Sequence, residues 1–257
     1  MIGTAYRVEG NGPPWVTLIT GIANDLTMWD GQVPVLEPRF NVLRYDLRGH
    51  GGTRASAGDY TTDLLVQDLL ELLDAHRIER TSLVGLGLGG ALAQAFAIRH
   101  PHRVERLMPC CCRAQMVPDF AVMWQGLIEN VKKNGVEAIV EPTAQRWFSD
   151  EFKARHPELL DDVRKMIRRT SRDGYLGCAG AFLGLNLEKE IHRIRVPTHY
   201  LSGMDDKLGG PPPLMQRLAD RVPGARHSSV PNAAHIANIQ NPGAFNLAMA
   251  EFIHAHS

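Results

Sequence analysis

Short apolar runs alternate with amphipathic stretches along most of this chain. Seven of the runs predict strands, at residues 3–10, 15–22, 41–47, 81–87, 104–111, 198–204 and 225–232. Three stretches predict helices: residues 61–76 repeat leucines at three-to-four spacing, residues 88–100 are small and apolar, and Asn241-Pro242 opens a helix that extends to about residue 254. The alternation predicts an α/β fold with a mainly parallel central sheet flanked by helices on both faces.

The strand–helix alternation stops between residues 115 and 194. Four helical patterns follow one another there without a clear strand, at residues 124–134, 136–148, 157–171 and 175–183. An insertion of this kind between two strands predicts a helical cap over the carboxyl edge of the sheet, where open α/β sheets bind ligands. We therefore expect a core built from residues 1–114 and 195–257, with residues 115–194 as the cap.

The charge balance narrows the range of partners. Lysine and arginine together number 28, aspartate and glutamate also number 28, and 44% of the 257 residues are hydrophobic. A chain with no net charge lacks the electrostatic reason to bind nucleic acid or an anionic membrane. We expect a small-molecule substrate as the partner, no cofactor, and a monomer or a homodimer.

The first residues and the cysteines indicate in which cellular compartment the protein is expected. No basic segment followed by an apolar one opens the chain, and no run approaches the roughly 18 apolar residues of a membrane span. Three of the four cysteines are consecutive, Cys110 to Cys112, and the fourth is Cys178, so neither a disulfide framework nor a zinc pair is indicated. We expect a reduced, cytoplasmic protein without a metal.

The turn after the fourth predicted strand carries the most informative motif. Residues 85–90 read Gly-Leu-Gly-Leu-Gly-Gly, between a strand and a helix. In a nucleophile elbow, G-x-S-x-G, a strand turns sharply into a helix and the central residue is strained, while the flanking glycines avoid side-chain clashes. Gly85 and Gly89 match that pattern, and Gly87 stands where the nucleophilic serine is expected.

A dinucleotide-binding loop is the competing interpretation, because residues 85–90 also fit G-x-G-x-x-G. That loop normally follows the first strand of its domain and precedes an acidic residue at the end of the next strand. Here the motif follows several strands, and the next segment reads Arg103-Val104-Glu105-Arg106. The position of the motif therefore favours the nucleophile elbow.

Other motifs carry a family resemblance over nearly the whole chain. Residues 44–51, Arg-Tyr-Asp-Leu-Arg-Gly-His-Gly, resemble the R-x-D-x-R-G-x-G turn of the α/β-hydrolase fold family. Residues 25–30, 146–148 and 174–178 are further similar to the 3-oxoadipate enol-lactonase branch of that family. The resemblance implies an α/β-hydrolase fold, a hydrolase of carboxylic ester or lactone bonds, and a carboxylate-bearing enol-lactone from aromatic catabolism as the substrate.

The resemblance also implies partners for the nucleophile position, in the chain order nucleophile, acid, histidine. The acid is Asp206, in the Gly-Met-Asp-Asp turn after a strand, with Asp205 as the fallback. The histidine is His235, after Pro231-Asn232 and before the last helix. An acid at this place holds the imidazole tautomer and stabilises the imidazolium. His50, by contrast, belongs to the Arg-Gly-His-Gly turn, and we expect it to be structural.

The remaining site predictions concern the oxyanion hole and the pocket. Two backbone N–H groups are needed for the developing negative oxygen, and we expect them from Leu88 and Ile22. The pocket candidates come from the cap: Trp124, Arg146, Trp147 and Tyr175. Arg146 either pairs with a substrate carboxylate or forms a surface salt bridge, and the aromatic residues either line the pocket or pack the cap. The consecutive cysteines are expected to be buried filler rather than a replacement nucleophile.

Gly87 is compatible with three kinds of protein at the level of the sequence. The chain is an inactivated variant of a serine hydrolase, or His235 and Asp206 act as a general base on water or on the substrate, or the protein binds a ligand without turnover. Base chemistry without serine includes direct hydrolysis, decarboxylation, C–C cleavage and isomerisation. Common to all three is the loss of a covalent nucleophile.

Overall fold

A seven-stranded sheet forms the centre of the computed structural model, which describes residues 3–255. The strands are β1 (Tyr6–Glu9), β2 (Trp15–Ile19), β3 (Asn41–Tyr45), β4 (Thr81–Leu86), β5 (Val104–Cys110), β6 (His199–Gly203) and β7 (Arg226–Val230). Each lies inside a predicted apolar run. The runs extend further than the strands because apolar residues continue into the buried loops that follow β2, β3 and β5.

The order across the sheet is β1-β3-β2-β4-β5-β6-β7, and every neighbouring pair is parallel except β1 with β3. The predicted mainly parallel sheet is therefore confirmed. In a parallel sheet the carboxyl ends of the strands meet at one edge, so the loops after β2, β4, β5 and β6 gather there. Those loops hold residues 20–25, 87, 111–113 and 204–211, and they build the site.

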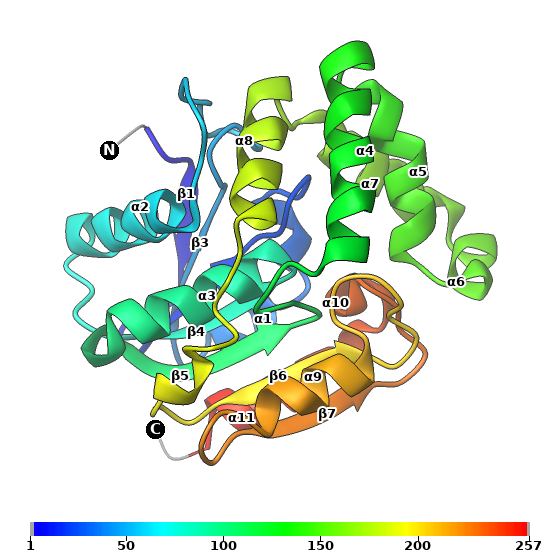
Figure 1. Ribbon diagram of the computed structural model, residues 1–257. Coiled ribbons are helices and arrows are strands. Elements are labelled where there is room, and N and C mark those ends of the chain that lie inside the picture. The colour runs from blue at the N-terminus through cyan, green and yellow to red at the C-terminus, as the bar shows by residue number, and fades with distance from the viewer. Residues whose placement is uncertain (1–2, 256–257) are drawn as a thin grey trace.

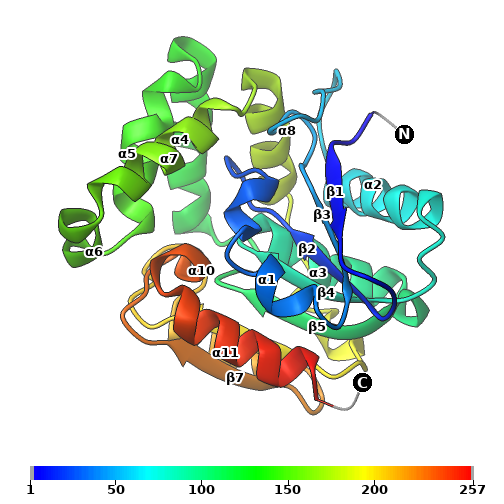
Figure 2. The same ribbon diagram turned by 180° about the vertical axis from the view of Figure 1, so that it is seen from behind.

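Helices cover both faces of the sheet (Figures 1 and 2). On one face lie α2 (Thr62–Ala75), α3 (Leu88–Arg99) and α9 (Pro212–Ala219), and on the other α1 (Val33–Leu36) and α11 (Pro242–Ile253), with the short α10 (Ala237–Gln240) just before α11. The three predicted core helices are present. Helix α9 was absent from the prediction because its run of prolines reads as a loop, although proline suits the first turn of a helix.

Five α-helices lie between β5 and β6: α4 (Pro118–Asn134), α5 (Glu137–Trp147), α6 (Asp150–Arg155), α7 (Pro157–Arg168) and α8 (Arg172–Leu183). Figure 1 shows them together above the carboxyl edge of the sheet. Helix α4 begins earlier than predicted, with Pro118 in its first turn, and α6 was not predicted. Ser171 caps α8 and does not end α7. We propose that residues 115–194 are the cap, and we use that name for helices α4–α8.

The turn at residues 46–52 attaches the cap to the sheet. Asp46 accepts hydrogen bonds from the N–H groups of Leu26 (2.6 Å) and Gly52 (2.8 Å), which fixes the turn against the loop after β2. The carbonyl of Gly49 accepts the N–H of Ser171 at 2.7 Å. A Cβ atom on Gly49 would overlap the backbone of Gly174, so the turn and α8 touch backbone to backbone. A glycine is required at that crossing.

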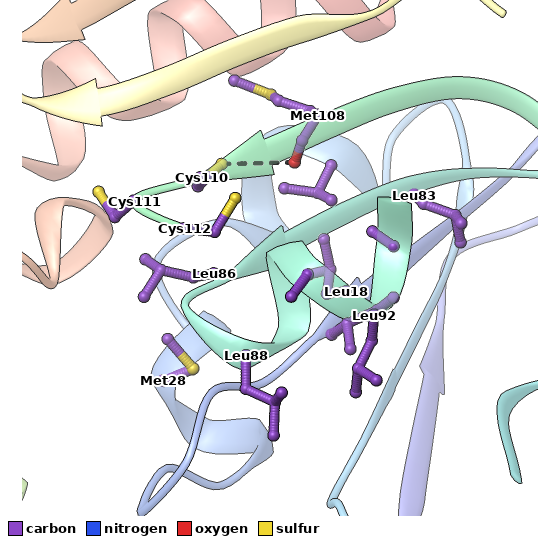
Figure 3. Close-up of a cluster of buried hydrophobic side chains, with 14 of the residues drawn as sticks. Leu18, Met28, Leu83, Leu86, Leu88, Leu92, Met108, Cys110, Cys111 and Cys112 are labelled. Atoms are coloured by element: carbon purple, nitrogen blue, oxygen red, sulfur yellow. Dashed lines mark hydrogen bonds between the residues drawn. The ribbon is translucent and has the colours of Figure 1, made fainter. Parts of the chain in front are cut away.

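Close backbone approach also determines the turn from β4 into α3. A Cβ atom on Gly85 would lie well under 3.0 Å from the carbonyl of Gly89, and one on Gly89 equally close to the carbonyl of Ile19. Figure 3 shows the apolar surroundings of this turn, with Leu86 and Leu88 beside it and the cysteines at the end of β5. The flanking glycines of the motif are therefore steric requirements of the fold.

Substitution of Gly89 tests that requirement. Gly89→Ala is expected to lower the free energy of unfolding by about 3 kcal/mol, because neither backbone can yield without moving β2 or α3. Gly126→Ala is the matched control: Gly126 is exposed on α4 with open space around it, and alanine there is expected to stabilise by roughly 0.5–1 kcal/mol. Urea denaturation measures both. A loss below about 1 kcal/mol for Gly89→Ala would contradict the steric requirement.

His50 supplies a pH-dependent prediction. Its ring is fully buried, Nδ1 lies 2.9 Å from the carbonyl oxygen of Arg48, and burial lowers its pKa from 6.5 to about 4. Between these pH values the unfolded chain binds the proton and the folded chain does not, so stability falls as the pH drops from 6.5 to 4. At pH 4 this effect of His50 lowers the free energy of unfolding by about 3 kcal/mol relative to neutral pH.

His50→Gln is expected to remove that part of the acid sensitivity. Urea denaturation at pH 8, 6, 5 and 4 measures it, with the pH 8 value of each protein as its own reference. The loss of unfolding free energy between pH 6 and pH 4 should be smaller for the variant. An equal loss in both proteins would show that His50 takes up its proton in the folded state.

Candidate active site

Gly87 occupies the sharp turn between β4 and α3. Its φ is +61° and its ψ is −120°, a backbone conformation that residues with side chains rarely adopt. The N–H of Gly87 donates to the carbonyl of Cys110 at 3.0 Å, and its own carbonyl accepts from Gly90 and Ala91 in the first turn of α3. The sharp backbone geometry of a nucleophile elbow is thus present, and glycine adopts it without strain.

The space beside Gly87 faces the imidazole of His235. A Cβ atom built on Gly87 would lie 3.6 Å from Nε2 of His235 and 4.0 Å from the Cα of Gly21. These are ordinary van der Waals distances, so a serine side chain would fit, and its hydroxyl would reach Nε2. Because glycine stands there, the same space is open to a small molecule.

Asp206 holds the other side of the imidazole. Its Oδ2 lies 3.1 Å from Nδ1 of His235, and its carboxylate accepts the N–H groups of Leu208 (2.7 Å) and Gly210 (2.9 Å). Burial by itself would raise the pKa of Asp206, but the charge and hydrogen bond of His235 and the two backbone donors outweigh it and leave the pKa below its ordinary value. Asp205, the fallback candidate, is exposed to solvent.

The loop that bears His235 is held by the cap. The carbonyl of Trp147, the last residue of α5, accepts the N–H of His235 at 3.0 Å and that of Ile236 at 3.3 Å. Gln240 accepts from the N–H of Ala234 and donates to the hydroxyl of Ser149 at 2.7 Å. Nothing in the sequence pattern pointed to Gln240, because its partner Ser149 lies 91 residues away.

The two predicted oxyanion donors lie at this site. Within residues 3–255, neither the N–H of Leu88, at the start of α3, nor that of Ile22 donates to another residue. Ile22 belongs to a tight turn closed by a 3.4 Å hydrogen bond from Asn24 to Gly21, in which Ala23 has a φ of +62°. Unsatisfied N–H groups and a helix N-terminus beside Gly87 favour a negative oxygen there.

A cavity of about 70 Å³ brings the predicted residues together. Gly87, Ile22, Leu88 and His235 line it from the core, and Trp124, Arg146, Trp147 and Tyr175 line it from the cap. Asp206 stands behind the imidazole. The sequence had not indicated several further lining residues, chiefly Asn24, Arg113, Phe120, Met123, Thr143 and Phe182. By the same measure one water needs roughly 10–15 Å³, so the cavity admits several waters or a small ligand.

Aromatic rings form the cap side of the cavity. Trp124 stacks on Tyr175 with ring centroids 6.3 Å apart and meets Phe182 edge to face at 5.1 Å. Burial raises the pKa of Tyr175, so its hydroxyl stays protonated. These rings both pack the cap and line the cavity, and their role in binding a substrate stays a prediction.

Arg146 lies at the same wall without a carboxylate partner among the described residues. Its Nε donates to the carbonyl of Pro142 one helical turn earlier, and its Nη1 lies 3.9 Å from the sulfur of Met123. The surface salt bridge that the sequence left open is thus not formed within residues 3–255. The guanidinium remains available to a ligand carboxylate.

The consecutive cysteines lie at the end of β5 (Figure 3). Cys111 and Cys112 line the cavity. All four cysteines are free and buried. Burial raises the pKa of the Cys111 thiol well above its ordinary value, and Sγ of Cys111 accepts the N–H of Gly203 at 3.3 Å. A thiol that resists ionisation is a poor nucleophile, which supports packing as the role of these side chains.

Residues 3–255 contain no clustered metal ligands. No group of three or more histidine, cysteine, aspartate or glutamate side chains in this range is placed to hold a metal ion. In the same part of the chain, no helix combines the length and apolar character needed to span a membrane.

Comparison with known proteins agrees with the fold. The chain is 28% identical to 3-oxoadipate enol-lactonase 2 of Acinetobacter baylyi, over 92% of this chain and 87% of that protein. It is also 28% identical to a putative carbamate hydrolase of a Caulobacter species, over 98% and 96%. The crystal structure of the enol-lactonase from Burkholderia xenovorans LB400 superposes with a TM-score of 0.94 at 33% identity, covering 98% of this chain and 97% of that one.

These relatives are hydrolases, and the chain has the same ancestry. The sequence model of the alpha/beta hydrolase fold matches residues 14–242, which includes the elbow, Asp206 and His235. The catalytic roles of those residues stay predictions, since similarity assigns none of them in this chain. The chain belongs to the α/β-hydrolase fold family and resembles its 3-oxoadipate enol-lactonase branch.

Proposed function

We propose that this protein hydrolyses a small carboxylate-bearing lactone or ester, with His235 and Asp206 activating water directly. The observation that carries the proposal is the 3.6 Å between Nε2 of His235 and the position of a Cβ on Gly87. A water molecule in that space would have the imidazole as one polar partner, with the N–H groups of Leu88 and Ile22 nearby. It would occupy the place from which a serine attacks in other members of the family.

The hydrogen bond to Asp206 determines which proton the imidazole carries. Because the carboxylate accepts from Nδ1, the neutral ring holds its proton there and presents the Nε2 lone pair towards Gly87. Nε2 is then a base, and the buried carboxylate stabilises the imidazolium that forms. Without a serine hydroxyl in between, the base acts on water itself.

The steps of such a hydrolysis balance with these groups alone. Water loses a proton to Nε2 of His235 as its oxygen bonds to the carbonyl carbon. The negative charge moves to the carbonyl oxygen, where the N–H groups of Leu88 and Ile22 would receive it. When the intermediate collapses, the C–O bond to the leaving group breaks and the imidazolium returns its proton to the leaving oxygen.

The substrate class follows from the cavity and the relatives. The walls are aromatic and apolar, and Arg146 offers a guanidinium without a partner carboxylate among residues 3–255. Relatives named as 3-oxoadipate enol-lactonases support a small enol-lactone of aromatic catabolism. Four free, buried cysteines suit the reducing cytoplasm, which we infer as the location.

Gly87→Ala and Gly87→Ser test the proposal together. Alanine fills the space for water at the cost of backbone strain at the positive φ of residue 87, and it is expected to lower the rate of enol-lactone hydrolysis at least about 10-fold. Serine restores the covalent route and is expected to leave the protein active. His235→Gln, which removes the base, should lower the rate of the parent chain by about 10² to 10⁴. Steady-state hydrolysis rates of the four proteins, with matched unfolding curves, provide the measurement.

Three different outcomes of these assays would contradict direct hydrolysis by water. A parent chain no faster than His235→Gln, with at least about a 100-fold gain in Gly87→Ser, identifies an inactivated serine hydrolase. Ligand binding with no turnover in any of the four proteins indicates a binding protein. Consumption of the substrate to a product that is not the hydrolysed acid indicates decarboxylation, C–C cleavage or isomerisation by the same base.

A further inference from the structure

Arg113 is the cavity residue whose surroundings the proposed hydrolysis leaves unexplained. It follows β5 and the three cysteines, on the core side of the cavity, and its side chain is partly buried. The guanidinium lies over the ring of Phe120, with Cζ 3.9 Å from the ring centroid. This contact holds the side chain flat against the first turn of α4.

Arg113 has no ion-pair partner within the described chain. One Nη donates to the carbonyl of Leu208 at 2.9 Å, and the buried Nε has no hydrogen-bond partner. No carboxylate lies within ion-pair distance of this guanidinium among residues 3–255. Burial lowers the pKa of Arg113, and the more distant Asp206 carboxylate compensates only in part. A desolvated cation without a partner is costly to stability and is typical of a binding site.

The lining of the cavity as a whole is cationic. It contains two guanidinium groups, Arg113 from the core and Arg146 from the cap, and no aspartate or glutamate. The indole N–H of Trp124, also on this wall, is buried and has no partner within residues 3–255. The cavity thus presents cations and N–H donors from two different elements, and the one carboxylate close by, Asp206, is turned towards His235.

We propose that Arg113 is a substrate-binding residue that holds a carboxylate distinct from the one held by Arg146, so that the cavity accepts a small dicarboxylate. The inference rests on the proposed function, since it assumes that the cavity beside Gly87 and His235 is where the substrate binds. A carboxylate at each guanidinium neutralises the cavity. The apolar walls between them suit a short methylene chain or ring.

A purely structural role for Arg113 has a different consequence. Its hydrogen bond to Leu208 braces the loop that carries Asp206, and Leu208 itself donates to that carboxylate. If bracing were its only role, removal of the guanidinium would disturb Asp206 and His235 for every substrate alike. If it binds a carboxylate, the loss is confined to ligands that carry the second negative charge.

Binding of adipate, hexanoate and adipamide to the full chain separates the two roles without any need for turnover. The parent is expected to bind adipate at least about 10-fold more tightly than hexanoate, and hexanoate more tightly than the uncharged adipamide, by titration calorimetry. Arg113→Gln should weaken adipate binding by about 10- to 100-fold and leave hexanoate binding within about 2-fold. Arg80→Gln, on an exposed arginine that pairs with Glu105 outside the cavity, should change neither.

Equal affinity of the parent for adipate and hexanoate would overturn the proposal. So would an Arg113→Gln variant whose affinity for adipate and for hexanoate falls by the same factor. The same holds if its rate on the neutral ester 4-nitrophenyl acetate, relative to the parent, falls as far as its rate on charged esters. Either result would assign Arg113 the role of bracing the loop of Asp206. Adipate binding that depends on Arg113 in a chain that hydrolyses nothing would support this inference and contradict the proposed function. A failure of this inference and a failure of the proposed function are therefore distinguishable.

Discussion

The close packing of backbones around residue 87 is the constraint on which the site depends. Strand β4 turns into α3 within a few residues, and this close approach leaves no room for a side chain at Gly85 or Gly89. That turn holds residue 87 at a positive φ, brings the N-terminus of α3 to the carboxyl edge of the sheet, and leaves the N–H of Leu88 without an acceptor among residues 3–255. The geometry belongs to the backbone, and glycine adopts it without the strain that a side chain would bring.

Gly87 therefore removes one function and leaves its neighbours in place. Asp206 still holds His235 through a 3.1 Å hydrogen bond, and the cap still holds the loop of His235 through Trp147 and Gln240. In other triad hydrolases that lose a member, the remaining groups retain on the order of 10³–10⁴ of acceleration over water. We propose that this site offers more than those remnants, because water would take the place of the missing hydroxyl beside His235.

Local patterns predicted much of this architecture. The seven apolar runs and the glycine-rich turn are legible from neighbouring residues. Asp206 and His235 were expected from the family resemblance, and the structure places His235 beside Gly87 with Asp206 on the other side of its imidazole. Arg113 and Gln240 were not predicted, because their significance comes from partners far along the chain, such as Leu208 for Arg113. Helices α6 and α9 were missed where short helices begin next to serine or proline and lack a long repeat.

The central claim is that water, not a side chain, attacks the substrate of this chain. Intact-protein mass spectrometry of samples quenched during turnover of an enol-lactone in ¹⁸O-water tests it most directly. Both routes place ¹⁸O in the product carboxylate, but direct attack by water predicts no acyl adduct on the parent chain, whereas an adduct appears in Gly87→Ser. An acyl adduct on the parent, whether on a cysteine or on His235, would contradict it.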